Sequence, residues 1–570
     1  METRDMLWSG WGDPARAEPL PGPTAGLLRD LLGVRPAAAP PVGLAAVKVD
    51  APRLAGEDLT ALAAIVGDGN VRADAETRIR HMRGKSTPDL LRARAGETSD
   101  APDAVVLPGS HGEVLAVLEV CAAKRIAVVP FGGGTSVVGG LAPEGVDGFV
   151  ALDLRRMDRL VSVDEVSRTA VLQPGLRAPA AEALLAERGF TLGHFPQSFE
   201  WASIGGFAAA RSSGQASAGY GRFDDMVVGL TVATPTGALE VGRAPKSAAG
   251  PDLRQLVLGS EGAFGVITSV TVRIRPVPQA REYEGWRFAS FGEGAAALRR
   301  LAQDGPLPTV LRLSDETETM VGLADPSAIG TSSGARPLDG ESSGGARPLD
   351  GGGRGLEDGG RGLEDGAKTS SAGCLAVVGF EGAPDDVAAR RARAADVLGA
   401  AGGEPLGTAP GEKWEHGRFN APYLRDSLLD VGAFVETLET AAFWSDVPKL
   451  YEAVRHALIG TLSGAGRPPL VMCHISHVYE TGASLYFTVV SAQGEDPVEH
   501  WAHAKRAAND AIIGAGGTIS HHHGVGTDHR DWYAREIGPL GAAVLRAIKD
   551  RVDPAGILNP GVLVPPAPEE

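Results

Sequence analysis

The chain has 570 residues, which is too long for one ordinary domain, and 43% of them are hydrophobic, which is enough for a large core. We therefore expect two or three packed units. A formal net charge of −17 argues against nonspecific nucleic-acid binding, which depends on Lys and Arg patches. Three scattered cysteines offer neither a disulfide framework nor a CxxC metal motif. Without a secretory signal pattern or an apolar run of membrane-spanning length, we expect a cytoplasmic protein with no stable membrane span. Peripheral attachment to a membrane is left open.

Residues 1–98 form a predicted N-terminal helical segment that packs on the domain after it. Apolar residues recur at helical spacing over 58–66 and again over 76–84. Residues 86–97 follow as a predicted connector.

From residue 99 to residue 278, short apolar strands alternate with helices, and we predict one α+β domain. Ser110, with Glu113 three residues later, is the predicted N-cap of the first helix. The predicted strands lie within 103–108, 126–136, 149–157, 169–175, 226–237 and 265–278.

Residues 279–515 form a second predicted α+β unit, interrupted by a Gly-rich repeat. The repeat, Thr331–Ala372, has almost no apolar side chains to bury, so we predict a disordered insertion without a role in the chemistry. The chain resumes with a strand over 374–382, and helices are predicted from there through Ala457.

A further strand is predicted over 485–491, before the C-terminal segment 516–570. Its residues alternate, with Leu485, Phe487 and Val489 on one face and Tyr486 and Thr488 on the other. The C-terminal segment carries His521, His522 and His523 in a row. The run lies inside the chain, so a purification tag is excluded and the choice is between metal binding and catalysis.

A glycine-rich loop follows the predicted strand at residue 131. Gly132, Gly133 and Gly134 lack side chains that would keep backbone N–H groups away from a diphosphate. The spacing matches neither a Walker loop nor a Rossmann turn. Three glycines in a turn are, taken alone, more often only a turn.

Four further stretches follow this loop in order: "LQPG", "SIGGFAAARSSG", "GYGRFDDMVVGLTVATPTG" and "GSEGAFGVITSVTVRI". Together with the loop they resemble the FAD-binding domain of the vanillyl-alcohol oxidase/p-cresol methylhydroxylase superfamily. The resemblance implies an α+β fold, with a two-part FAD-binding domain of the p-cresol methylhydroxylase type and an α+β cap domain for the substrate. It also implies FAD, with its pyrophosphate at the glycine loop.

Some members of the superfamily attach the flavin through a histidine in or near that loop. This loop has Thr135 and Ser136 and no histidine, so we predict noncovalent FAD. The implied FAD contacts are Pro130, Phe131, Gly132, Gly133, Gly134, Thr135, Ser136, Gln197, Ser198, Ser203, Ala210, Arg211, Ser212, Ser213, Glu261, Gly262, Ala263, Phe264, Gly265, Val266 and Ile267.

Two branches of the superfamily compete. D-2-hydroxyacid dehydrogenases often hold a divalent metal with two strand histidines and a glutamate. Here His474 matches the first ligand, but Tyr486 and His522 stand at the other two positions. We therefore predict no metal, although His474 and His477 could still pair as ligands.

The other branch is the alkyldihydroxyacetonephosphate synthase family. This chain resembles it in "WSGWG" near the N-terminus, "PYLRDSLLDVGAFVETLETAAFW", "ASLYF" and "SHHHGVG". The resemblance runs from Trp8 to about Gly561, apart from the repeat. It implies exchange of an acyl group of acyl-dihydroxyacetone phosphate for a fatty alcohol, through a covalent adduct at flavin N5 and without net redox. A homodimer is the expectation for the family.

The resemblance also implies residue roles. Tyr486 is the implied acid/base, whose pKa its neighbours can lower, and Arg425 contacts substrate. The remaining implied catalytic residues are His521, His522, His523, Arg312 and His194. An imidazole and a phenol suit proton transfer at neutral pH, and an arginine suits a phosphate. Singly, each of these residues would more often be structural.

The chain departs from the family pattern at two places. His474 stands where the family has an arginine, and Thr527 and Asp528 stand where it has basic residues. Both changes reduce positive charge at the expected substrate end. The alternatives are therefore an FAD-dependent oxidoreductase acting on a 2-hydroxy or keto acid, and a flavin-binding protein without turnover.

Overall fold

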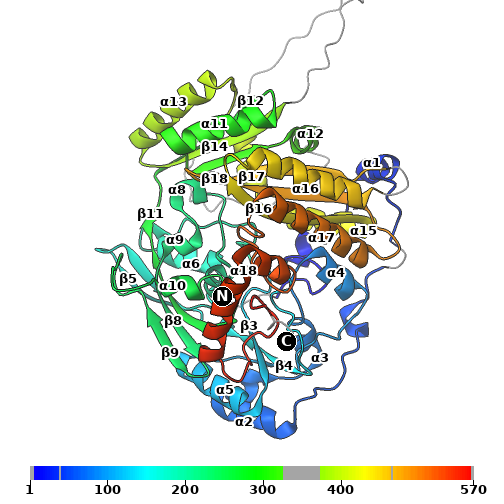
Figure 1. Cartoon of the computed structure of the whole chain (residues 1–570), viewed down its shortest axis with the longest axis vertical. Helices are drawn as coiled ribbons and strands as arrows, with labels where there is room; N and C mark the ends of the chain where they lie inside the picture. The colour runs from blue at the N-terminus through cyan, green and yellow to red at the C-terminus, as the bar shows by residue number, and fades with distance from the viewer. Residues whose placement is uncertain (1–4, 38–39, 325–372, 464–466, 566–570) are drawn as a thin grey trace, which may run out of the picture.

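The computed structural model describes residues 5–37, 40–324, 373–463 and 467–565. The predicted repeat insertion lies outside the described residues. Two halves lie one above the other in Figure 1: the strands of residues 71–276 are in the lower half, the strands within 280–492 are in the upper half, and the helix of residues 22–32 lies beside the upper half. The C-terminal helix returns to the lower half, so both halves are tied by distant parts of the chain.

The N-terminal segment contains more helix than the sequence predicts. The connector predicted over 86–97 is wrong, because Thr87–Arg94 is helical. Ser86 Oγ accepts a hydrogen bond from Asp89 N (3.1 Å), and Asp89 accepts one from Ser86 N (3.3 Å), which closes a capping box. The helices of this segment are η1 (Pro14–Arg16), α1 (Gly22–Leu32), η2 (Leu44–Ala46), α2 (Gly56–Val66), η3 (Asp68–Asn70), α3 (Ala75–Ile79) and α4 (Thr87–Arg94).

The lower half holds a four-stranded and a five-stranded sheet. The first has the order β1 (Val71–Arg72), β2 (Ala104–Val106), β4 (Phe149–Asp153) and β3 (Ala127–Phe131). Strands β2, β4 and β3 are parallel, as the crossover helix α5 (His111–Lys124) requires, and Ser110 caps that helix as predicted. Strand β3 ends at Phe131, which places the glycine loop at the carboxyl edge of this sheet.

The five-stranded sheet is antiparallel, with the order β5 (Leu160–Asp164), β6 (Thr169–Leu172), β10 (Val266–Arg273), β8 (Val227–Thr234) and β9 (Gly237–Val241). A short pair joins β7 (Phe190–Thr191) to β11 (Arg275–Pro276). The remaining helices of the lower half are η4 (Leu154–Arg156), α6 (Ala178–Ala186), α7 (Ile204–Ala210), α8 (Ser217–Tyr220), α9 (Phe223–Met226) and α10 (Arg254–Val257).

The upper half is one seven-stranded antiparallel sheet. Its order is β15 (Glu404–Gly407), β12 (Ala280–Phe288), β14 (Cys374–Gly382), β13 (Val310–Ser314), β17 (Leu470–Val478), β18 (Gly482–Ala492) and β16 (Ala433–Phe443). Helices are found through Ala457 as predicted, except over the strands β15 and β16, and β16 pairs with β18 at eleven positions. This long-range pairing overrides local helical preference.

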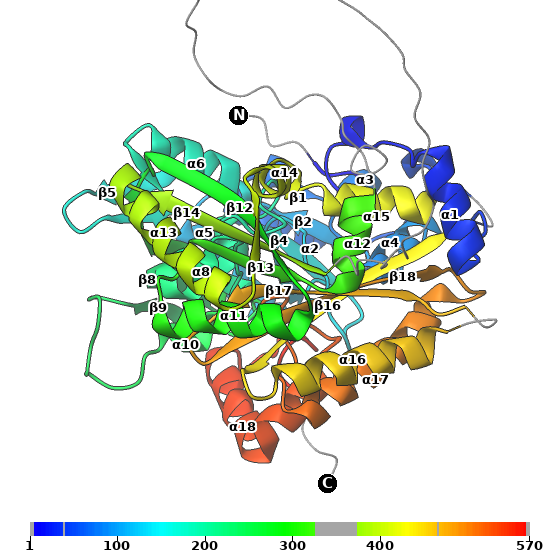
Figure 2. The same ribbon diagram turned by 90° about the horizontal axis from the view of Figure 1, so that it is seen from above.

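Helices cover one face of this sheet, and Figure 2 shows them from above. Helices within residues 409–430 pack against part of the other face. The covering helices are α11 (Phe291–Asp304), α13 (Pro384–Ala400), α16 (Val447–Leu462) and α17 (Pro497–Ala515), and the others are α12 (Glu316–Ala324), α14 (Ala409–Gly417) and α15 (Ala421–Asp430). The alternation predicted for β18 is confirmed: Leu485, Phe487 and Val489 are fully buried under the helices. Tyr486 therefore faces the other way.

The C-terminal segment links the two halves. Residues 516–529 run from the end of α17 to α18 (Arg530–Val552), which is interrupted at Gly538 (φ 70°) before Pro539. Beyond α18, Leu558 bridges to Val128 of β3. None of the helices in the described ranges has the length and apolar content to cross a membrane.

Candidate active site

A cavity of about 450 Å³ lies between the two halves. Its lower wall is the glycine loop, residues 130–137, with residues 202–210 and 261–267 beside it. Its upper wall is formed by β13, β16, β17 and β18 of the seven-stranded sheet, together with His522 and His523. One cavity therefore joins the predicted cofactor loop to most of the predicted catalytic residues.

The glycine loop has the shape of a cradle for a diphosphate. A Cβ on Gly132 would collide with Ser203 Oγ, and a Cβ on Gly133 would collide with the carbonyl of Trp201. The backbone N–H groups of residues 133–136 donate to no acceptor among the described residues. Free N–H groups in a glycine turn form an anion-binding concavity.

Unpaired polar atoms along the cavity also suit a flavin nucleotide. Gln197 Nε2, Ser213 Oγ and Gln215 Oε1 are buried without a hydrogen-bond partner among the described residues. All three residues line the cavity. Buried polar atoms are normally paired, so these atoms and the free N–H groups fit a polar cofactor such as FAD.

Tyr486 stands in a stack of rings on the upper wall. Its ring lies 4.9 Å from that of His474 at an interplanar angle of 19°, and 6.1 Å from that of His522 at 20°. His523 meets it edge-on at 5.6 Å. Burial raises the pKa of Tyr486 to about 12, and Glu436 adds to this effect. Thr437 and Arg425 do lower this pKa, as expected of neighbours, but burial outweighs them, so the phenol is protonated at rest.

A buried carboxylate, Glu439 of β16, holds the histidine loop. It accepts hydrogen bonds from the backbone N–H groups of His521 (2.8 Å), His522 (3.1 Å) and His523 (2.9 Å), and from Ser520 Oγ (2.8 Å). Burial alone would raise the pKa of Glu439, but the histidine loop, which directs three backbone N–H groups and a hydroxyl at this carboxylate, holds the pKa well below its usual value. Glu439 is thus an anion beneath the three imidazoles.

A second carboxylate, Glu261, holds the next part of the same loop from the lower half. Its Oε2 accepts the N–H groups of Val525 (2.8 Å) and Gly526 (2.9 Å). Gly524 N donates to Ser520 Oγ (3.1 Å), so six consecutive N–H groups, 521–526, end on side-chain oxygens. Burial raises the pKa of Glu261 to about 7. The loop is therefore fixed by one carboxylate from each half.

The three histidines differ in position. His522 and His523 line the cavity, while His521 lies behind them. The Nε2 atom of His521 is 2.6 Å from Tyr479 Oη, and its Nδ1 atom is 2.9 Å from His522 Nδ1. Burial lowers the pKa of His522 to about 3 and lowers that of His523, so both imidazoles are neutral at rest.

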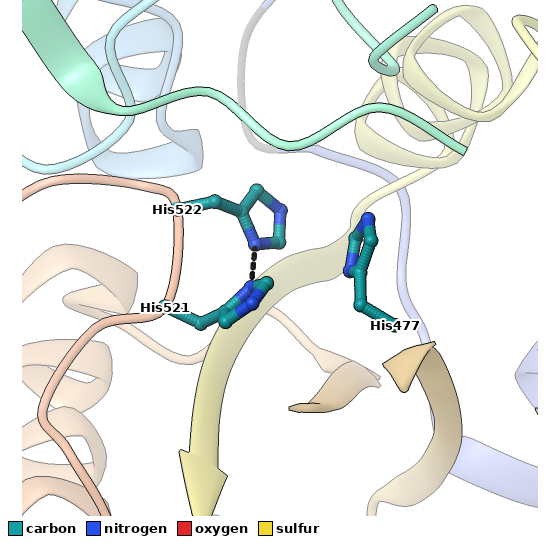
Figure 3. A group of neighbouring side chains, drawn as sticks. All are labelled: His477, His521 and His522. Atoms are coloured by element: carbon teal, nitrogen blue, oxygen red, sulfur yellow. Dashed lines mark hydrogen bonds between the residues drawn. The ribbon is translucent and has the colours of Figure 1, made fainter. Parts of the chain in front are cut away.

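His477 of β17 completes a group of three imidazoles with His521 and His522 (Figure 3). One nitrogen from each ring lies within 4.8 Å of the others, which is a spacing that could hold a metal ion. The sequence pairs His477 with His474 as potential ligands, but the structure groups it with the histidine loop instead.

Both predicted arginines line the cavity, and each already has anionic partners. Arg312 pairs with Glu318, and its Nη2 atom lies 3.0 Å from His474 Nδ1. Burial would raise the pKa of Glu318, but His474 and Arg312 hold it at about 2.

Arg425 donates to the carbonyl of Lys85 (2.6 Å) and lies 3.3 Å from Asp426. Both arginine charges are therefore partly neutralised before any ligand binds.

Comparisons with known proteins agree with this geometry. A family model described as FAD binding domain matches residues 102–242, and one described as FAD linked oxidases, C-terminal domain, matches residues 277–563. Alkyldihydroxyacetonephosphate synthase from Dictyostelium discoideum is 34% identical over 92% of this chain and 83% of its own length. The chain belongs to the alkyldihydroxyacetonephosphate synthase family.

Solved structures place this family member in the expected fold class. A structure of alkyldihydroxyacetonephosphate synthase matches with a TM-score of 0.79 at 29% identity, covering 98% of each chain. A structure of p-cresol methylhydroxylase matches with a TM-score of 0.65 at 16% identity, covering 90% of this chain and 98% of its own. The predicted FAD-binding domain with an α+β cap is therefore confirmed, while the proposed domain boundaries stay predictions.

Most residues predicted from the family resemblance line the cavity. Those that do are Pro130, Phe131, Gly132, Gly133, Gly134, Thr135, Ser136, Gln197, Ser198, Ser203, Ala210, Ser212, Ser213, Glu261, Gly262, Gly265, Ile267, Arg312, Arg425, Tyr486, His522 and His523. The predicted cofactor contacts that do not are Arg211, Ala263, Phe264 and Val266. Arg211 donates to the carbonyls of Gln255 in α10 and of Leu258 just after it, and the other three side chains are in hydrophobic cores.

His194 is not at the cavity surface, contrary to the prediction. Its ring packs against Phe207 and Phe223, and its Nε2 atom is 3.0 Å from Ser212 Oγ. Burial lowers its pKa to about 3, so it is a neutral residue behind the wall that Ser212 forms.

Thr527 and Asp528 do not line the cavity either. They are the residues at which the sequence predicts less positive charge near the substrate than the family has. Asp528 is paired with Lys505 at 2.6 Å. The part of the charge argument that rests on these two residues therefore stays a prediction.

Sequence reasoning missed the groups that organise this family member's site. Glu439, Glu318 and Tyr479 were not singled out, although each contacts a predicted residue. The register of β16 against β18 places Glu439 opposite Tyr486. That pairing joins positions far apart in the chain, and no local pattern indicates it.

Proposed function

We propose that this chain exchanges the acyl group of acyl-dihydroxyacetone phosphate for a fatty alcohol, releasing a fatty acid and leaving an alkyl ether. The observation that carries the proposal is the single cavity joining the glycine loop to Tyr486, His522 and His523. The relative from Dictyostelium discoideum, named alkyldihydroxyacetonephosphate synthase, supports the choice of reaction.

FAD would be held by the glycine loop, by Gln197 and by Ser213, and it would supply an electron sink beside the substrate carbon. We propose noncovalent binding, because residues 130–136 contain no histidine. Release of all the flavin from acid-precipitated protein tests this point, and flavin that stays with the pellet would contradict it.

Proton transfer falls to the ring stack on the upper wall. The exchange removes a proton from the carbon next to the ketone, and later a proton from the incoming alcohol. A neutral imidazole, His522 or His523, can accept a proton, and the protonated Tyr486 can donate one. Glu439 lies 3.5 Å from His522 Nδ1 and would stabilise the imidazolium that forms.

Arg425 and Arg312 are the proposed anchors for the substrate phosphate. An incoming phosphate would compete with Asp426 for Arg425 and with Glu318 for Arg312. This competition favours one second candidate, the oxidation of a 2-hydroxy acid. The carboxylate of such an acid carries a single charge, so it needs only one arginine to be released from its present partner.

The deciding experiment mixes the FAD-loaded protein, without oxygen, with acyl-dihydroxyacetone phosphate and a fatty alcohol. We expect alkyl ether and fatty acid in equal amounts and no lasting reduction of the flavin. Parallel samples receive D-lactate or glycolate. Full flavin reduction by either acid, with no ether formed, would establish the second candidate instead.

A further inference from the structure

We propose that His477, His521 and His522 form a binding site for one divalent transition-metal ion of the zinc class, in the wall of the cavity. The three residues come from two segments, β17 and the loop before α18, and their rings gather around a common space (Figure 3). The site needs neither flavin nor substrate, and an ion bound to His522 would leave His523 as the proton acceptor of the proposed reaction.

The nitrogens are close enough to hold such an ion after the His477 ring moves inward by up to about 1.5 Å, the difference between the 4.8 Å limit of the group and a tetrahedral spacing. One nitrogen per ring lies within 4.8 Å of the others, and the Nδ1 atoms of His521 and His522 are 2.9 Å apart. Zinc lies about 2.0–2.1 Å from imidazole nitrogens, so ligand nitrogens in a tetrahedral site are about 3.3 Å apart. The His521–His522 pair would open by a few tenths of an ångström as the ion replaces their hydrogen bond.

The outer nitrogens already have the partners that metal-bound histidines use. His477 Nε2 lies 3.0 Å from the carbonyl of Gly214, an acceptor that fixes a proton on Nε2 and leaves Nδ1 as the lone pair. His521 Nε2 contacts the hydroxyl of Tyr479 at 2.6 Å. Outer hydrogen bonds to a carbonyl or hydroxyl orient the ring and make the inner nitrogen a better ligand.

The lone pair of His477 is now used by two hydroxyls, Ser476 Oγ at 2.9 Å and Ser484 Oγ at 3.3 Å. These hydroxyls also contact each other at 2.7 Å. Each serine therefore keeps a hydrogen-bond partner when an ion takes the nitrogen. A buried hydroxyl without a hydrogen-bond partner would oppose metal binding, but binding leaves neither serine in that state.

The local charge favours a cation. Glu439 is a buried anion 3.5 Å from His522 Nδ1, and the nearby Arg222 is paired with Asp224 at 3.1 Å. The three imidazoles together with Glu439 therefore carry about one negative charge.

The test is a zinc titration of the tag-free, FAD-loaded protein by calorimetry, with elemental analysis after dialysis. We expect one Zn²⁺ per chain. His477→Gln and His521→Gln should each abolish stoichiometric binding. Tyr479→Phe, which removes only an outer hydrogen bond, should weaken binding by about 10- to 100-fold.

His456→Gln is the control, because the His456 side chain is 74% exposed on α16 and belongs to no histidine group. It should bind zinc like the unaltered protein. Equal flavin content and circular dichroism in all variants would show that folding is intact. If the unaltered protein binds no stoichiometric zinc, or if the two ligand variants bind it as well as the control does, the trio is only a hydrogen-bonded histidine chain and the proposal is overturned.

Discussion

At the glycine-loop end of the cavity, the groups that face a ligand are mostly backbone N–H groups and uncharged side chains, from three segments of the predicted FAD-binding domain. At the opposite end, rings and buried charges from β13, β16, β17, β18 and the histidine loop meet from positions far apart in the chain. The first end recognises a shape, whereas the second sets protonation states. A substitution at the first end should therefore change cofactor affinity, and one at the second end should change turnover.

The largest expected effect is at Tyr486. Tyr486→Phe removes the phenolic proton and leaves the ring stack with His474 and His522 in place. We expect turnover to fall by about 10²–10⁴-fold, the usual contribution of a general acid or base. Flavin content should be unchanged when read from the absorbance ratio.

Tyr451→Phe is the matched control. Tyr451 is on the helix-covered side of the same sheet, where its ring stacks on Phe487 and its hydroxyl contacts Asp315 at 3.1 Å. Turnover should be kept. A Tyr486→Phe protein with full turnover would remove the assigned acid/base role.

The next effect concerns the carboxylate under the histidine loop. Glu439→Gln replaces a buried anion that accepts three backbone N–H groups by an amide with one acceptor oxygen. We expect a loss of about 3–5 kcal/mol in the free energy of unfolding, measured with urea, because a buried ionic network is broken.

Turnover of Glu439→Gln should fall more than flavin affinity does. Glu452→Gln, an exposed substitution on α16, should alter neither quantity. Equal losses of turnover and flavin binding would mean that the two ends of the cavity are not separable.

Glu261 links the two ends of the cavity, and its titration should make the stability of the protein depend on pH. Burial raises its pKa to about 7 in the folded protein, so the folded state binds more protons than the unfolded state between about pH 4.5 and 7. The contribution of this group to stability is therefore present at low pH and is lost as the pH rises toward 7.

Glu261→Gln keeps an oxygen for Val525 and Gly526 and removes this titration. Relative to the unaltered protein, its free energy of unfolding should rise by about 2–3 kcal/mol between pH 5 and pH 8. Urea unfolding at both pH values measures the difference. Glu187→Gln, at an exposed position just after α6, should show no such change. If the free energy of unfolding of Glu261→Gln depends on pH in the same way as that of the unaltered protein, the raised pKa is contradicted.

The smallest effect is expected at the glycine loop. Gly132→Ala places a Cβ against Ser203 Oγ, so the loop must shift away from the diphosphate. We expect FAD affinity to fall by about tenfold, roughly 1.4 kcal/mol, with turnover of the loaded protein nearly unchanged. In Gly112→Ala, within α5, the new Cβ meets nothing closer than 4.0 Å, and FAD affinity should stay the same. A loss of turnover at saturating FAD would break the contrast between the two ends.

Local elements of the fold were predictable because they depend on patterns of residues close together in sequence. The alternation over 485–491 correctly places Tyr486 opposite the buried face of β18, and Ser110 correctly marks the start of α5. The helix expected over residues 433–443 is wrong because local patterns do not report long-range pairing. These residues are compatible with a helix, and only their pairing with β18 makes them the strand β16. The capping box at Ser86 was present in the sequence and was overlooked.

By itself, the sequence determined the cofactor loop, the family and the residues Tyr486, His522 and His523, because these depend on residue type and spacing along one segment. Only the tertiary structure decided which charges surround them. Glu439 and Glu261 come from a distant strand and a distant loop and hold the histidine loop. Burial in the folded protein keeps Tyr486 protonated and His522 and His523 neutral. Protonation states depend on desolvation and on charges a few ångströms away, and those distances exist only once the chain is folded.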